Sequence, residues 1–166
     1  MQMLIRLEAG HFVQAADDFT TLAPDGDLPT QGGVIVPFAR WAELGESLLN
    51  EGRNVGVRLT SADAAEALVP VLERLSVVAV EFPIFRDGRG YSTAVLLRTR
   101  FGYRGELRAV GDVLVDQAWN LARCGFDAFE TQVSAEQFAA SAHRFRHVYQ
   151  ASADDRQPAF VEREAV

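Results

Sequence analysis

A repeated order of segments constrains the fold of this chain more than any other feature. From about residue 33 onward, a short apolar run is followed by a segment with helical periodicity and then by a turn. Parallel strands need a long crossover between them, usually a helix, and such crossovers are right-handed. The chain is therefore predicted to be an α/β protein with a mostly parallel sheet of about five strand–helix units flanked by helices. The predicted strands are 34–38, 55–59, 77–82, 106–110 and 126–130.

Two architectures fit such a repeat, namely an open doubly wound sheet and part of a TIM barrel. A complete TIM barrel takes eight units in about 250 residues, whereas this chain has 166. A compact open or partly curled sheet is therefore expected. The run 77–82 is rich in β-branched residues and is predicted to lie near the centre of the sheet. Residues 4–7 could form an extra edge strand.

The same pattern suggests how the chain is divided. Residues 1–150 are predicted to form one α/β domain, and the polar segment 151–166 a loosely held C-terminal tail. A helix is expected over 65–75, kinked or made irregular by Pro70. The final helix is predicted to begin with a capping box and to bury Phe145 and Tyr149 on one face.

Composition narrows the class of protein. The formal charge of −7 disfavours a nucleic-acid partner, because a phosphate backbone repels an acidic surface. The single cysteine, Cys124, excludes an intramolecular disulfide framework and cannot by itself hold an iron–sulfur cluster. No run of about 18 apolar residues predicts a membrane span, and the first residues do not resemble a signal peptide. A cytoplasmic location is expected.

A loop after the third predicted strand offers a candidate ligand site. Ligands of open parallel sheets bind at the carboxyl ends of the strands, and this loop contains two glycines and leads into a helix. The residues predicted to bind a small anion are Asp87, Arg89, Gly90, Tyr91 and Ser92. The alternative is structural, since Asp-Gly is a common turn pair and the serine could cap the helix.

Two carboxylates after the next strand are the candidate catalytic groups. Asp112 follows the strand directly, and Asp116 comes one helical turn later, so the two could share a proton. The first could equally be the N-cap of the helix. With no third ligand in the pattern, no metal site is predicted. The chain contains no dinucleotide, phosphate-loop or nucleophile-elbow motif, so no cofactor is predicted either.

Three runs of sequence carry a resemblance to a known family. They are FPIFRDGRGYS at 82–92, GELRAVGDVLVDQ at 105–117 and RCGFDAF at 123–129. The chain resembles an uncharacterised bacterial family whose members are described as oxidoreductases involved in sulfite reduction and are encoded beside assimilatory sulfite or nitrite reductases. The resemblance implies an accessory role in sulfur assimilation, with the loop 87–92 and Asp112 forming the site. The residues themselves supply no redox centre.

Two functions therefore stay open. In one, the protein is a partner-binding module that assists a sulfite or nitrite reductase and binds a small anion. In the other, it is an enzyme that uses Asp112 or Asp116 as general acid or base on an anionic substrate containing sulfur or phosphate. A shallow edge with exposed aromatic residues would favour the module, and a deep pocket ringed by the acidic residues and Arg89 would favour the enzyme. Open sheet edges also predict self-association.

Overall fold

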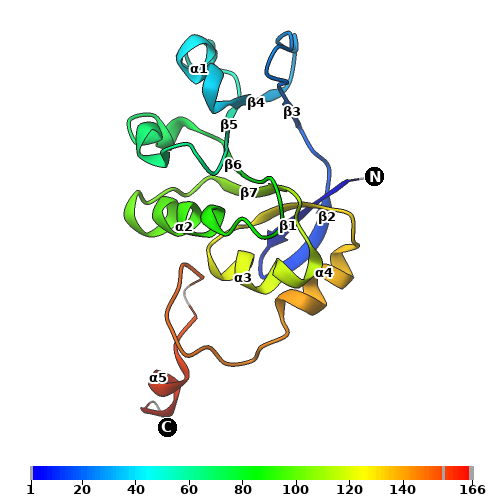
Figure 1. Ribbon diagram of the computed structural model, residues 1–166, viewed down its shortest axis with the longest axis vertical. Coiled ribbons are helices and arrows are strands. Elements are labelled where there is room, and N and C mark those ends of the chain that lie inside the picture. Colours follow the sequence, from blue (N-terminus) through cyan, green and yellow to red (C-terminus); the bar gives the residue numbers. More distant parts are fainter. Residues whose placement is uncertain (1, 155, 165–166) are drawn as a thin grey trace.

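A curled, eight-stranded sheet forms the body of the molecule (Figure 1). The computed structural model describes residues 2–154 and 156–164. The strand order is β2-β1-β8-β7-β6-β5-β4-β3. The strands are β1 (Met3–Glu8), β2 (His11–Ala15), β3 (Phe19–Thr21), β4 (Gly33–Pro37), β5 (Val55–Leu59), β6 (Val77–Phe82), β7 (Glu106–Gly111) and β8 (Ala128–Thr131).

The helices α1, α2, α3 and α4 lie along the outer side of this half-barrel (Figure 1). A doubly wound sheet would carry helices on both faces, so the curled alternative is the one observed. The helical elements are η1 (Phe38–Arg40), α1 (Trp41–Asn50), η2 (Ala65–Leu68), η3 (Leu72–Arg74), α2 (Arg89–Val95), η4 (Leu96–Arg100), η5 (Val115–Gln117), α3 (Ala118–Arg123), α4 (Ala135–Ala142) and α5 (Ala159–Glu164). None of them is long and apolar enough to cross a membrane.

The sheet is mixed, which corrects the prediction of a mostly parallel one. Strands β3 to β8 pair in parallel, whereas β1 pairs antiparallel with both β8 and β2. Strands β1 and β2 are joined through Ala9 and Gly10, both with positive φ (48° and 84°), and so short a connection requires an antiparallel hairpin. The run 4–7 is therefore an interior strand rather than an edge strand.

Two predicted helices differ from the structure. The segment 65–75 contains two short 3-10 helices, η2 and η3, instead of one helix interrupted at Pro70. Helix α4 begins at the predicted capping box, in which the Ser134 hydroxyl accepts from the Gln137 N–H, but it ends at Ala142. Phe145 and Tyr149 consequently lie beyond the helix and are exposed, which corrects the prediction that they are buried.

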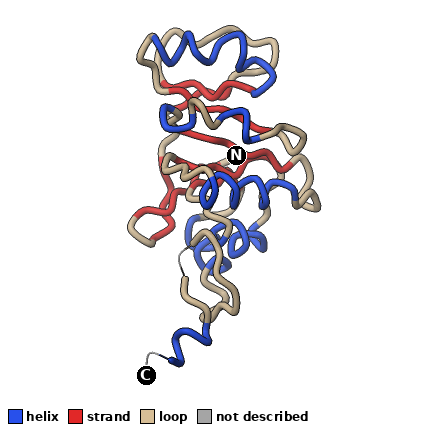
Figure 2. Tube along the Cα trace, turned by 90° about the vertical axis from the view of Figure 1, so that its left-hand side faces the viewer, coloured by secondary structure: helices blue, strands red, loops and turns tan. Residues whose placement is uncertain are grey.

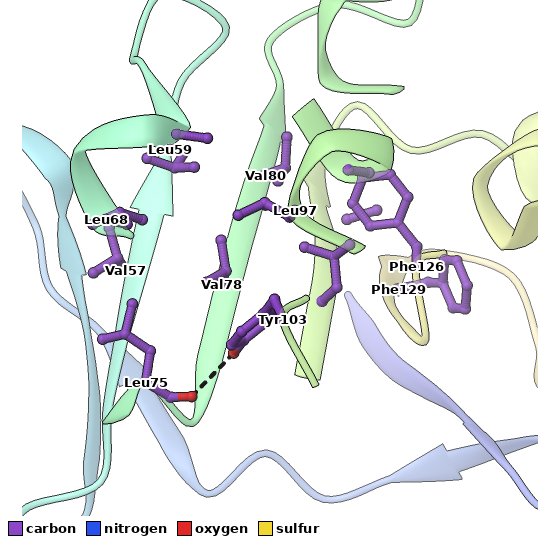
Figure 3. Packing of buried hydrophobic residues seen from close by; sticks show 14 of the residues in the cluster. Val57, Leu59, Leu68, Leu75, Val78, Val80, Leu97, Tyr103, Phe126 and Phe129 are labelled. Carbon is purple, nitrogen blue, oxygen red and sulfur yellow. Dashed lines mark hydrogen bonds between the residues drawn. The ribbon is translucent and has the colours of Figure 1, made fainter. Parts of the chain in front are cut away.

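The main hydrophobic core lies between the outer face of the sheet and the helices (Figure 3). Alternate residues of each strand point into it, as the two-residue period of a strand requires. In the central strands these residues include Val57, Val78 and Val80, and Leu97 packs on them from the helical side. The Tyr103 hydroxyl reaches into the same layer and donates to the Leu75 carbonyl oxygen at 3.2 Å.

The inner face of the sheet carries charged residues instead. Arg108 on β7 is completely buried there and donates to Asp17 at 2.7 Å and 3.1 Å and to Glu106 at 2.7 Å. Glu130 lies 3.3 Å from the same guanidinium, and Arg6 shares Glu106 at 2.7 Å. A buried guanidinium is tolerated only with such hydrogen-bonded partners.

Residues 16–18 hold the two edges of the sheet near each other. They alone link β2 to β3, so at that corner the edge strands lie no more than about 14 Å apart. In Figure 1 this link runs from β2 to β3 on the side of the sheet opposite α1 and α2. Asp17 in the link binds Arg108, and the Ala16 carbonyl accepts from Arg6 at 3.1 Å. The link is thus fastened to the inner face by two arginines.

The C-terminal segment returns to α3 before it leaves the body. The Ser152 hydroxyl and the Ala153 N–H both donate to the Arg123 carbonyl oxygen, at 2.7 Å and 3.1 Å. Helix α5 lies at the opposite end of the molecule from α1 in both views (Figure 1, Figure 2). The domain boundary at residue 150 stays a prediction.

Candidate functional site

The loop 83–88, which follows β6, is fixed to the start of the next strand–helix unit. The Phe85 N–H donates to Asp112 Oδ2 at 2.9 Å, and the Phe85 carbonyl accepts from Gln117 Nε2 at 3.0 Å. The same Gln117 side chain accepts from the Leu114 N–H at 2.9 Å, and the Asp112 N–H donates to the Phe82 carbonyl at 2.8 Å. Both polar groups of the Phe85 backbone are therefore occupied, which ties the loop to the residues that follow β7.

These contacts define what Asp112 does in the fold. The N-cap of η5 is Leu114, so the alternative that Asp112 caps the helix is wrong. Its carboxylate anchors the neighbouring loop instead. Gln117, which holds that loop from the other side, escaped prediction because a glutamine in an amphipathic segment gives no signal of a contact 32 residues away.

Asp87 and Arg89 pair with each other. Arg89 Nε donates to Asp87 Oδ1 at 2.9 Å and Nη2 donates to Oδ2 at 2.7 Å, and the Arg89 N–H also reaches Oδ1 at 3.2 Å. The Arg89 hydrogen bond, helped by one from Ser61, holds the pKa of the Asp87 carboxyl well below its usual range. A simple anion at this loop would meet a guanidinium whose charge is already balanced by Asp87, and the same carboxylate would repel it.

The other three predicted ligand residues have separate surroundings. Gly90 is buried, and a Cβ there would lie 2.8 Å from the Phe82 ring, so this glycine lets α2 approach β6 closely. The Tyr91 ring meets the Phe82 ring edge-on at 5.2 Å, and burial raises the pKa of Tyr91. Ser92 is exposed within the first turn of α2, whose N-cap is Gly88, so the serine is not the cap.

Asp112 and Asp116 do lie at one hollow. It has a volume of about 550 Å³ at the ends of β7 and β8, and its lining includes both aspartates, Gln2 and Glu130. Asp87, Arg89 and Ser92 are not part of that lining. The structure therefore brings the two candidate catalytic carboxylates together and leaves the candidate anion-binding residues elsewhere. Among the described residues, no group of three or more His, Cys, Asp or Glu side chains could hold a metal ion.

Apolar side chains are exposed beside this hollow. Ile84 is 52% exposed, Phe85 49% and Leu114 40%. The backbones of Phe85 and Leu114 bind the same Gln117 amide, which brings the two segments together. We call their exposed apolar residues the edge patch (Ile84, Phe85 and Leu114). The Arg86 guanidinium carbon lies 5.9 Å from the centre of the Phe85 ring, which places a cation against the patch.

These features define an α/β half-barrel with an apolar patch and an acidic hollow at the carboxyl edge of its sheet. The family model described as a bacterial protein of unknown function (DUF934) matches residues 56–160. The chain belongs to this family. A search of curated proteins finds no match.

Proposed function

We propose that the protein is a partner-binding module, and that the edge patch is the surface that docks onto the partner. The observation that carries the proposal is that Asp112 and Gln117 hold the backbone of the exposed Phe85, next to the exposed Ile84. An exposed phenylalanine normally costs solvation free energy, and two hydrogen bonds that fix its backbone reduce the entropy that binding a partner must cost.

The chemistry of the patch suits protein recognition. Aromatic residues and arginine are enriched where binding energy is concentrated in protein interfaces. Phe85 and Arg86 provide both, beside the aliphatic Ile84 and Leu114. The partner surface should therefore combine an apolar pocket with an acidic rim.

An assimilatory sulfite or nitrite reductase is the partner that we propose. This choice rests on the sequence resemblance. We leave a simple anion at Arg89 out of the proposal, because the Asp87 carboxylate already balances the charge of Arg89 and would repel the anion.

A binding measurement tests the module. The protein carrying Ile84→Ser and Phe85→Ser is titrated against the cognate sulfite reductase by biolayer interferometry and compared with the unchanged protein. Loss of two central apolar contacts should weaken binding at least tenfold. Phe160→Ser is the matched control, since Phe160 is 61% exposed on α5, far from the sheet. Equal affinity of the double variant and the control would refute the proposal.

A second candidate has its own support, because Asp112 and Asp116 share a hollow. In it, the protein is an enzyme that uses one carboxylate as general acid or base on an anionic substrate containing sulfur or phosphate. Asp112→Asn separates the two functions. The amide oxygen can still accept from the Phe85 N–H, so partner binding should survive, whereas acid–base catalysis at this position would be lost. Asp112→Ala removes the acceptor and should weaken partner binding as well.

A further inference from the structure

We propose that a second cleft, at the mouth of the half-barrel, binds a small zwitterion of the amino-acid class with an apolar side chain. The cleft lies over the carboxyl ends of β4, β5 and β6 and has a volume of about 930 Å³. Pockets for small molecules have volumes of about 300–1,000 Å³, and the carboxyl face of a parallel, curled sheet is where such sheets bind ligands. None of its lining residues belongs to the edge patch.

An ion pair lies in the lining of the cleft and provides both signs of charge. Arg58 Nε donates to Glu81 Oε2 at 3.2 Å, and Arg58 Nη2 lies 2.9 Å from Oε1. The side chains of Arg58 and Glu81 are 32% and 25% exposed, so a ligand can reach both. Within the described part of the chain, Nη1 of Arg58 makes no hydrogen bond. Each Glu81 oxygen also keeps a second acceptor site.

This pair selects a ligand that carries both charges. A ligand carboxylate can accept from the unoccupied Arg58 Nη1, but without a companion cation it is repelled by Glu81. A ligand ammonium can donate to Glu81, but without a companion anion it is repelled by Arg58. A zwitterion satisfies both groups at once, and hydrogen bonds between ionised groups are the strong ones.

The other charged side chains of the cleft do not change this preference. Asp63 accepts from the Thr60 N–H and hydroxyl at 2.7 Å and 2.8 Å. Arg40 donates to the Gly26 carbonyl at 2.8 Å and to Glu43 at 3.4 Å. Asp25 adds an exposed carboxylate at the rim. With two arginines and three acids in its lining, the cleft disfavours a simple anion.

The remaining lining is mostly apolar. Besides Thr21 and Thr60, it comprises Leu22, Ala23, Pro24, Pro37, Phe38 and Ala39. Leu22 is buried, and its N–H donates to the Ile35 carbonyl at 2.9 Å, which fixes the loop after β3 to β4. An apolar ligand side chain can therefore pack on preformed walls while its charged groups meet Arg58 and Glu81.

The test uses three compounds with the same apolar body. L-Phenylalanine carries both charges, 3-phenylpropanoate only the carboxylate and 2-phenylethylamine only the ammonium. Each is titrated into the full-length, ¹⁵N-labelled protein and followed by amide shifts of residues 58–60 and 81. We expect L-phenylalanine to bind at least tenfold more tightly than either analogue. Equal binding of all three, stronger binding of an analogue, or no response to L-phenylalanine would overturn the proposal.

Variants locate the site. Arg58→Gln and Glu81→Gln should each weaken L-phenylalanine binding at least tenfold, because each removes a charged contact. Arg89→Gln is the control, since Arg89 is also an ion-paired arginine but lies outside the cleft, and it should leave binding unchanged. If Arg58→Gln fails to fold, Arg58→Lys takes its place in the test. The lysine keeps the positive charge, so this variant should retain part of the binding. Unchanged affinity in both Arg58→Lys and Glu81→Gln would contradict the assignment.

Discussion

Replacing Arg108 by glutamine removes a fully buried cation from the inner face of the sheet while keeping a side chain of similar length. In the unchanged protein, burial disfavours the charged guanidinium, but hydrogen bonds and charges from Asp17 and Glu106 outweigh burial and raise the pKa of Arg108. The variant leaves Asp17, Glu106 and Glu130 facing one another with their nearest shared cation gone.

The magnitude follows from the burial of the partners. Removing one member of a buried ion pair costs about 3–5 kcal/mol of unfolding free energy. The three carboxylate side chains keep some contact with water, at 34%, 17% and 22% exposure, so we expect the lower end, about 3 kcal/mol. Arg58→Gln is the matched control on the same face. Its single pair is about one-third exposed, and its loss should cost no more than about 1 kcal/mol.

Urea unfolding followed by circular dichroism measures both variants. A second substitution sharpens the result, because Asp17→Asn in the Arg108→Gln background removes one unpaired carboxylate. Asp17→Asn should lower the free energy of unfolding less in the Arg108→Gln variant than in the unchanged protein. The coupling energy between the two substitutions should be about 0.5–3 kcal/mol. If Arg108→Gln loses no more free energy than Arg58→Gln, or if the two substitutions are additive, the inner-face network does not stabilise the fold as we argue.

Four further predictions concern the packing of a glycine, two buried side chains and the edges of the sheet. Gly90→Ala should cost about 1–3 kcal/mol of unfolding free energy in the same urea assay, because the added Cβ overlaps the Phe82 ring. Gly88→Ala is the control. Its Cβ would meet only Tyr91, at 3.8 Å, so this variant should be neutral or stabilising. Burial, the largest effect, raises the pKa of Tyr103 well above its usual range. Stability from Tyr103 is therefore present below about pH 10 and lost above it, and Tyr103→Phe should reduce that alkaline loss in urea titrations. Burial also raises the pKa of the Cys124 thiol, so iodoacetamide should modify the native protein much more slowly than the urea-unfolded chain. Self-association through β2 or β3 is tested by size-exclusion chromatography with light scattering, where a clean monomer at micromolar concentration would contradict it.

Much of the sheet was predictable because its central strands are continuous apolar runs. The predicted run 77–82 coincides with β6, which lies inside the sheet between β5 and β7. The antiparallel part was missed because nothing local in β1 specifies that it pairs with β8, more than 120 residues away. Helix α4 was predicted too long because its helical periodicity continues through 145 and 149, while the chain turns away after Ala142.

The candidate site was predictable in position but not in detail. The rule that ligands bind at the carboxyl ends of parallel strands placed Asp112 and Asp116 at one edge, and they do line one hollow there. The pairing of Asp87 with Arg89 and the anchoring of Phe85 depend on side-chain geometry that no periodicity reveals. The second cleft was not predicted because Arg58 and Glu81 are polar positions within apolar strands, and their ion pair forms only once β5 and β6 lie side by side.

That register gives Arg58 and Arg108 different roles on the inner face. One row across the sheet reads Arg58, Ala79, Arg108, Ala128 and Arg6, on β5, β6, β7, β8 and β1. Large and small residues alternate between neighbouring strands, as layers in a TIM barrel do, and each alanine leaves room for the guanidiniums beside it. Arg108 lies in the middle of the row and is completely buried. Carboxylates from three segments bind it, so its charge stabilises the fold and is not available to a ligand. Arg58 lies two strands away, between Ala79 and Pro37 of β4, with a single partner and about a third of its side chain exposed. Its remaining donor group is therefore free to bind a ligand at the mouth of the half-barrel, and the same alternation that stabilises the sheet also positions the proposed site.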